Sequence, residues 1–200
     1  SSRTRPSWQA ASRASSESMP SCSTSIRAFL GPSPGTRITS NADGGTALRR
    51  SSSYVFKVVQ EAQYRRLGSI KHPYWVRAMV HLLQSKKSKY FRWHDSGDVQ
   101  NLKHLAKIFK VASLTPDVKH WMPTREAWVK PYLKYAPSNL VIRFSMPMVD
   151  QEAAASWPNT STVVTDSQKR TCPAPDQDNA CKDCRACWDP NVKNVAYGQH

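Results

Sequence analysis

The sequence predicts an α/β fold, either a parallel sheet of βα repeats or a partial, half-closed barrel of the TIM type. Three segments (90–98, 118–126 and 139–147) are rich in aromatic or β-branched residues, and each ends in polar side chains. The stretches between them are long enough for right-handed crossovers between parallel strands. Two shorter strands are expected at 160–165 and 194–197. In such a sheet the carboxyl ends of the strands share one edge, where ligands usually bind.

The helices follow from apolar spacing and from capping residues. An apolar stripe of near-helical period covers 54–68, and Pro73 opens a second helix. Asp98 is expected to cap a third helix, and Thr124 a fourth whose regularity is interrupted by Pro131. These helices are expected to cover the sheet.

The chain divides near residue 53 into an arm and a domain. Residues 1–53 are dominated by Ser, Thr, Pro, Gly and Arg without periodic apolar residues, which is typical of disorder. Residues 54–200 are expected to form one α/β domain. The formal net charge of +15 and pI near 9.9 indicate attraction to polyanions, so nucleic acid or another anionic partner is expected.

No segment approaches the roughly 20 apolar residues that cross a bilayer, and the first residues lack a secretory apolar stretch. We therefore expect a cytoplasmic protein without a membrane partner. In that compartment clustered cysteines are more typical of metal sites than of disulfides.

The most specific chemical pattern is a C-terminal loop, 172–187, that contains four cysteines. Three of them follow one another at C-x2-C intervals, a spacing that lets neighbouring sulfurs face one centre. Serial spacing favours a 4Fe–4S cluster, whereas zinc sites more often use two separated pairs; a disulfide is the structural alternative. The predicted ligands are Cys172, Cys181, Cys184 and Cys187. The fifth cysteine, Cys22, stands alone and has no predicted role.

The polar strand tips form a second candidate site. Charged groups from three tips on one edge could surround a substrate, and Arg125 and Arg143 could bind a carboxylate or phosphate bidentately. The structural alternative is that Asp95 and Asp98 only cap a turn and a helix. The candidate catalytic residues are Asp95, Asp98, Arg125, Glu126 and Arg143.

The chain from Tyr54 onward resembles the phage gene-product-88 family, whose members occur in bacteriophages and prophages and have no established function. The segments 90–98, 121–126, 141–145, 184–189 and 195–197 look like its successive signature blocks. The resemblance implies a partial βα barrel similar to radical S-adenosylmethionine enzymes, together with cluster binding.

The chain departs from the family just before residue 54. The family has a cysteine-bearing segment there, whereas this chain has Ser51-Ser52-Ser53 and only Cys22 upstream. The C-x3-C-x2-C signature of radical enzymes is absent, so no reaction is assigned and enzymatic activity is left open. The alternative function is that of a zinc-binding, basic accessory protein for nucleic acid. A third hypothesis is a protein that acts only by contacting a host partner.

Overall fold

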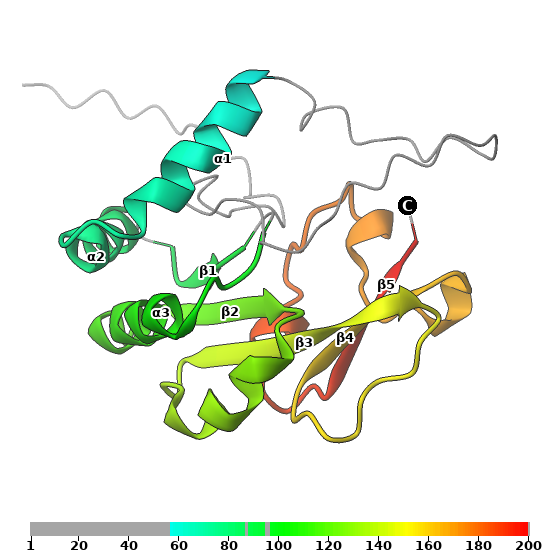
Figure 1. Cartoon of the computed structure of the whole chain (residues 1–200). Coiled ribbons are helices and arrows are strands. Elements are labelled where there is room, and N and C mark those ends of the chain that lie inside the picture. The colour runs from blue at the N-terminus through cyan, green and yellow to red at the C-terminus, as the bar shows by residue number, and fades with distance from the viewer. Residues whose placement is uncertain (1–56, 87, 95–96, 200) are drawn as a thin grey trace, which may run out of the picture.

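The computed structural model describes residues 57–86, 88–94 and 97–199. The predicted disordered arm and Asp95 lie outside these residues. The described chain forms a curled sheet with helices packed on its outer face (Figure 1). No helix in this part of the chain is long and apolar enough to cross a bilayer.

The sheet contains all five strands that the sequence predicts. All four pairings are parallel, and the spatial order is the same as the order along the chain. A parallel sheet wound in sequential order curls in one direction, as strands do in a closed βα barrel. The predicted half-barrel is therefore confirmed. The strands are β1 (Tyr90–Arg92), β2 (Lys119–Thr124), β3 (Leu140–Val149), β4 (Thr160–Val164) and β5 (Asn194–Gly198).

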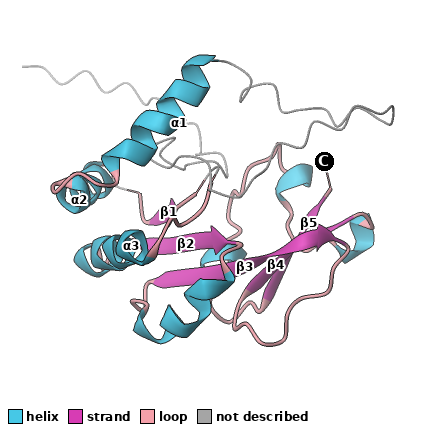
Figure 2. Ribbon diagram, viewed as in Figure 1, coloured by secondary structure: helices cyan, strands magenta, loops and turns pink. Residues whose placement is uncertain are grey.

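Helices precede β1 and connect the first three strands (Figure 2). Three are α-helical and the fourth, η2, is a 3₁₀ helix that contains Pro131. Since proline cannot donate the hydrogen bond that a regular α-helix needs, the expected irregularity of this helix is explained. The helices are α1 (Lys57–Ser69), α2 (Trp75–Ser85), α3 (Leu102–Leu114) and η2 (Ala127–Tyr135), followed by the 3₁₀ turns η3 (Ser167–Lys169), η4 (Ala174–Asp176) and η5 (Ala186–Trp188).

The two faces of the sheet bury different groups. Met122 of β2 belongs to the large core beneath α2 and α3, where it is 0% exposed. Trp121, its neighbour, belongs to a smaller core with Cys187 and Val195. Adjacent strand residues point to opposite faces, so the cysteine loop covers the inner face of the half-barrel while the helices cover the outer face.

The predicted cap of α3 was wrong by three residues. Asn101 precedes the helix, and its side-chain oxygen accepts a hydrogen bond from the backbone N–H of His104 at 2.9 Å. The carboxylate of Asp98 instead accepts hydrogen bonds from Thr124 and Arg125 at the end of β2. Both residue types suit a cap, and tertiary contacts decide between them.

Replacing Asn101 by alanine should lower the free energy of unfolding by about 1 kcal/mol, because the first turn of α3 loses an acceptor. Urea denaturation provides the measurement. Lys103→Ala, an exposed change in the same turn, is the matched control and should alter stability by less than about 0.5 kcal/mol. Equal stability of Asn101→Ala and the wild type would contradict the assignment.

Candidate functional site

The cysteine loop connects β4 to β5 and lies against the inner face of the sheet. Its 3₁₀ turn η5 places Cys187 beside Trp121 and Val195, and the side chain of Cys187 is only 6% exposed. In Figure 1 this connection is drawn in orange and red beside β4 and β5. Few of its residues are in regular secondary structure, so specific side-chain contacts must hold it in place.

Arg143 of β3 makes the largest number of these contacts. Its side chain is 0% exposed, and its five N–H groups donate hydrogen bonds to five backbone carbonyls. Four of these carbonyls belong to η5 itself or to the residues that connect it to β5. The accepting oxygens are those of Ala186 at 2.7 Å, Asp189 and Val192 at 2.8 Å, Cys187 at 3.0 Å and Thr160 at 3.3 Å.

This arrangement changes the interpretation of the predicted arginine pair. With all its donors bound to carbonyls, Arg143 has none left for a substrate carboxylate or phosphate. Arg125, by contrast, is exposed at the tip of β2. Arg143 therefore has no donor free to form a bidentate clamp with Arg125, and it organises the loop instead.

The guanidinium of Arg143 is also a buried charge. Burial lowers its pKa, while the nearby groups Cys187, Tyr197 and Asp189 raise it. Among the described residues no ion pair joins Arg143 to a carboxylate. A buried cation without a paired anion is costly, so its surroundings favour negative charge.

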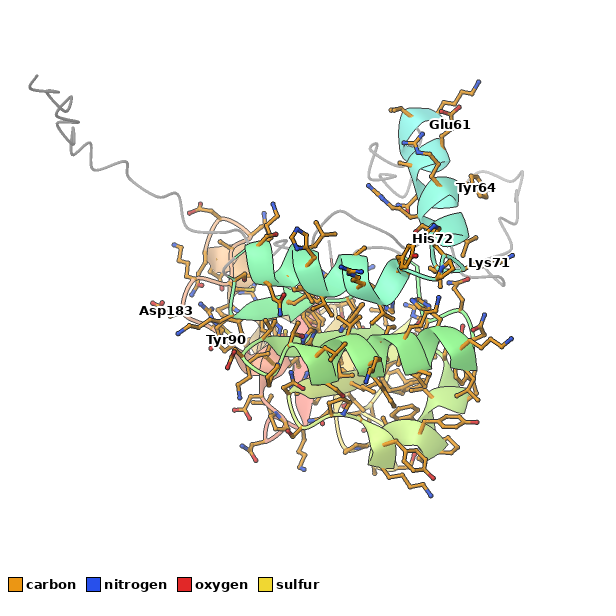
Figure 3. All side chains as sticks on the ribbon, turned by 90° about the vertical axis from the view of Figure 1, so that its left-hand side faces the viewer. Glu61, Tyr64, Lys71, His72, Tyr90 and Asp183 are labelled. Atoms are coloured by element: carbon orange, nitrogen blue, oxygen red, sulfur yellow. The ribbon has the colours of Figure 1, made fainter. Side chains whose placement is uncertain are left out.

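Two further contacts fix the loop to β1. The indole N–H of Trp188 donates to the backbone oxygen of Phe91 at 3.0 Å. The guanidinium of Arg185 lies 4.7 Å from the centre of the Tyr90 ring, which is a cation–π distance. Figure 3 shows Tyr90 and Asp183, a loop residue, at the same end of the molecule. The loop therefore bridges the inner face from β1 to β5.

The cysteines gather at this position. Cys172, Cys184 and Cys187 are free thiols, whereas Cys181 is disulfide-bonded. The three free thiols are close enough to interact electrostatically: Cys184 raises the pKa of Cys172, and both raise the pKa of Cys187. Burial is the largest cause in both cases, and the pKa of the Cys187 thiol is raised to about 11.

Tyr197 of β5 completes this cluster. Its hydroxyl oxygen lies 3.2 Å from the sulfur of Cys187, and burial raises its pKa well above the usual value. No site role was predicted for Tyr197. The signal that could have identified it is the two-residue spacing from the buried Val195 on the last strand, which puts both side chains on the same face of the sheet.

The donor set suits a metal that prefers sulfur. Thiolates bind zinc and iron–sulfur clusters, and three of the four predicted ligands are free and adjacent. In the described residues, however, no three His, Cys, Asp or Glu side chains are already arranged to hold an ion. Binding would therefore require the loop to move its sulfurs together. The residues that would hold the metal are Cys172, Cys184 and Cys187, with Cys181 after reduction of its disulfide.

At the strand tips, Asp98 joins the loop after β1 to the end of β2. Its carboxylate accepts hydrogen bonds from the Thr124 hydroxyl at 2.7 Å and from the backbone N–H groups of Arg125 and Val99, both at 2.6 Å. Burial raises its pKa and these hydrogen bonds lower it. Glu126 accepts from the indole N–H of Trp128 at 2.8 Å. Both carboxylates thus have structural partners at the predicted edge.

Three buried histidines lie behind these tips. His94, His104 and His120 are at most 2% exposed, and burial lowers their pKa values to about 4, 3 and 4 respectively. His104 packs against Trp75 at a ring-centre distance of 5.6 Å and His120 against Trp93 at 5.8 Å, while the ring of His94 lies 6.2 Å from that of His104. The rings are therefore neutral at pH 7.

Hydrogen bonding assigns the proton on two of these rings. Nδ1 of His94 lies 3.3 Å from the carbonyl oxygen of Pro123, which can only accept, so Nδ1 carries the proton. Nδ1 of His104 accepts from the N–H of Gln100 at 3.2 Å, so its proton is on Nε2. Both Nε2 atoms are buried without a partner among the described residues. His94 therefore keeps an unprotonated ring nitrogen, Nε2, buried at this edge of the sheet.

A family model described as gene product 88 matches residues 47–190. This range includes both the strand tips and the four clustered cysteines. No curated protein and no solved structure matches the chain. The expected likeness to radical enzymes consequently stays a prediction, although the half-barrel itself is confirmed.

Replacing Arg143 by leucine should lower the free energy of unfolding by about 4 kcal/mol or more, because several buried carbonyls lose their donor at once. Arg125→Leu, the exposed arginine of the neighbouring tip, is the control and should cost less than about 0.5 kcal/mol. Urea denaturation of both variants measures the difference. Similar losses in the two variants would contradict the anchoring role.

The buried histidines should make the protein sensitive to acid. Their folded-state pKa values lie below the unfolded value of about 6.5, so their contribution is complete above that pH and is lost as pH falls toward 4. For each ring, the free energy of unfolding should fall by roughly 2 kcal/mol between pH 7 and pH 5, because the ring is protonated in the unfolded state before it is protonated in the folded state. The measurement is urea denaturation at each pH.

His94→Gln should lower the number of protons taken up on unfolding by about one, and the unfolding free energy should then depend less steeply on pH. The exposed His81 gives a matched control, since His81→Gln makes the same substitution at a ring that is not buried. A wild-type slope that His94→Gln does not alter would show that the buried ring is not the source.

Proposed function

The chain belongs to the gene product 88 family, and we propose that it binds a metal centre through its cysteine loop, with a 4Fe–4S cluster as the expected occupant and zinc as the alternative. The proposed ligands are Cys172, Cys184 and Cys187, joined by Cys181 when its disulfide is reduced. We further propose that the protein acts in the cytoplasm of the host cell, where thiols are kept reduced.

The observation that carries the proposal is the position of three free thiols beside a buried guanidinium. Arg143 binds the carbonyl of Cys187 itself, so its positive charge lies next to a proposed ligand. Three or four thiolates outweigh the charge of a divalent ion, which gives the loaded loop a net negative charge. That charge would offset the burial of Arg143, for which the described residues provide no ion pair.

The role of Cys181 separates two forms of the site. With four thiolate ligands the coordination is closed, as in structural zinc sites. With three ligands one position stays open, as catalytic metal sites require. Only the second form would bring substrate to the metal, and Arg125 at the edge of the sheet would then be an exposed group for an anionic substrate. Whether the protein is an enzyme depends on this difference.

The test is anaerobic purification followed by iron, sulfide and zinc analysis and a visible absorption spectrum. A cluster predicts about four iron and four sulfide per chain with a broad brown band, and zinc predicts about one ion without colour. Cys184→Ser and Cys187→Ser should each lose the metal, since each removes a free thiol from the group. Cys181→Ser should lose it only if four ligands are needed.

Asp183→Ala is the matched control, because it changes an exposed residue of the same loop without removing a sulfur. It should retain the wild-type metal content. A wild-type protein without iron or zinc after anaerobic purification and reconstitution would contradict the proposal. Metal content that survives all the loop substitutions would also contradict it, since the ligands would then lie elsewhere.

A further inference from the structure

The positive charge is concentrated in one part of the domain. Residues 57–114, which include α1, α2, β1 and α3, contain twelve Lys and Arg but three Asp and Glu. Residues 115–199 contain ten and nine. The basic character that the composition suggests for the whole chain is therefore, within the domain, a property of the segment 57–114. Such asymmetry is typical of a surface that meets a polyanion.

The surface that carries this charge is held in a defined shape. Lys107 of α3 donates from its ammonium group to the backbone oxygens of Ile70 at 2.5 Å and His72 at 3.3 Å. These two carbonyls lie in the turn between α1 and α2, so the turn is attached to α3. Lys107 is thereby occupied, whereas Lys71 in this turn and Arg77 in the first turn of α2 are exposed.

Aromatic side chains are exposed on the same helices. Tyr64 on α1 is 65% exposed and Tyr74, just before α2, is 66% exposed. His72 lies between them in sequence; its Nδ1 accepts the backbone N–H of Tyr74, and the two rings are 5.6 Å apart. Figure 3 shows Tyr64, Lys71 and His72 together near one end of α1, which projects from the rest of the domain.

We infer that α1, the α1–α2 turn and the exposed face of α2 bind single-stranded nucleic acid. Exposed lysine and arginine would contact phosphates, while Tyr64, His72 and Tyr74 would stack on bases. Unpaired bases are favoured over a duplex because a duplex keeps its base faces stacked on one another, which leaves exposed rings without a role. This surface lies on the helical side of the sheet, so the inference does not depend on the metal centre.

Fluorescence anisotropy with labelled 20-nucleotide oligo(dT) and oligo(U) tests the inference on the full chain. Binding should weaken with salt, with a slope of log K against log[salt] near −0.7 for each phosphate contact. The double variant Lys71→Glu/Arg77→Glu should bind at least tenfold more weakly. Tyr64→Ala should bind about fivefold or more weakly without a change in the salt slope, because stacking contributes without charge.

The helix η2 provides controls of the same chemistry at the far end of the molecule from α1 (Figure 1). Lys130→Glu/Lys134→Glu makes the same charge change, and Tyr135, 64% exposed and 5.0 Å from the Lys134 ammonium, matches Tyr64. These controls should bind within about twofold of the wild type. Equal losses in both sets, tighter binding of a 20-base-pair duplex or of anionic lipid vesicles, or no binding at low salt would each overturn the inference.

Discussion

The buried guanidinium of Arg143 is the interaction on which the inner face of the half-barrel depends. One side chain from the middle of the sheet satisfies five carbonyls, four of them in η5 or in the residues that connect it to β5. A loop with so little regular structure cannot satisfy its own backbone groups. Arg143 does so, and by binding the carbonyl of Cys187 it also determines where that cysteine lies relative to Tyr197 and the other thiols.

The two faces of the sheet consequently have separate tasks. The outer face buries a large aromatic and aliphatic core with three neutral histidines, which gives the domain its stability. The inner face has a smaller core and carries thiols, a phenol and a guanidinium. Because neighbouring strand residues alternate between faces, substitutions in the cysteine loop can change chemistry while leaving the helix-covered core intact.

Much of the fold could be predicted from the sequence because the five strands are rich in β-branched or aromatic residues and the helices have regular apolar spacing. The half-barrel was predicted from the alternation of strands and helices along the chain. The cap of α3 could not be predicted, since Asp98 and Asn101 suit it equally and only the position of Thr124 selects between them. The burial of Arg143 could not be predicted from the sequence either. Its position near the expected end of a strand suggested a ligand-binding group, whereas β3 continues to Val149 and the loop that surrounds Arg143 lies more than forty residues later in the chain.

The central claim is that the clustered thiols hold a metal. The most direct measurement is an X-ray absorption spectrum at the edge of whichever metal copurifies anaerobically with the chain. We expect a first coordination shell dominated by sulfur, with fewer sulfur ligands or no bound metal in Cys187→Ser. A shell of nitrogen and oxygen alone, unchanged in that variant, would contradict thiolate binding and would place the metal outside the cysteine loop.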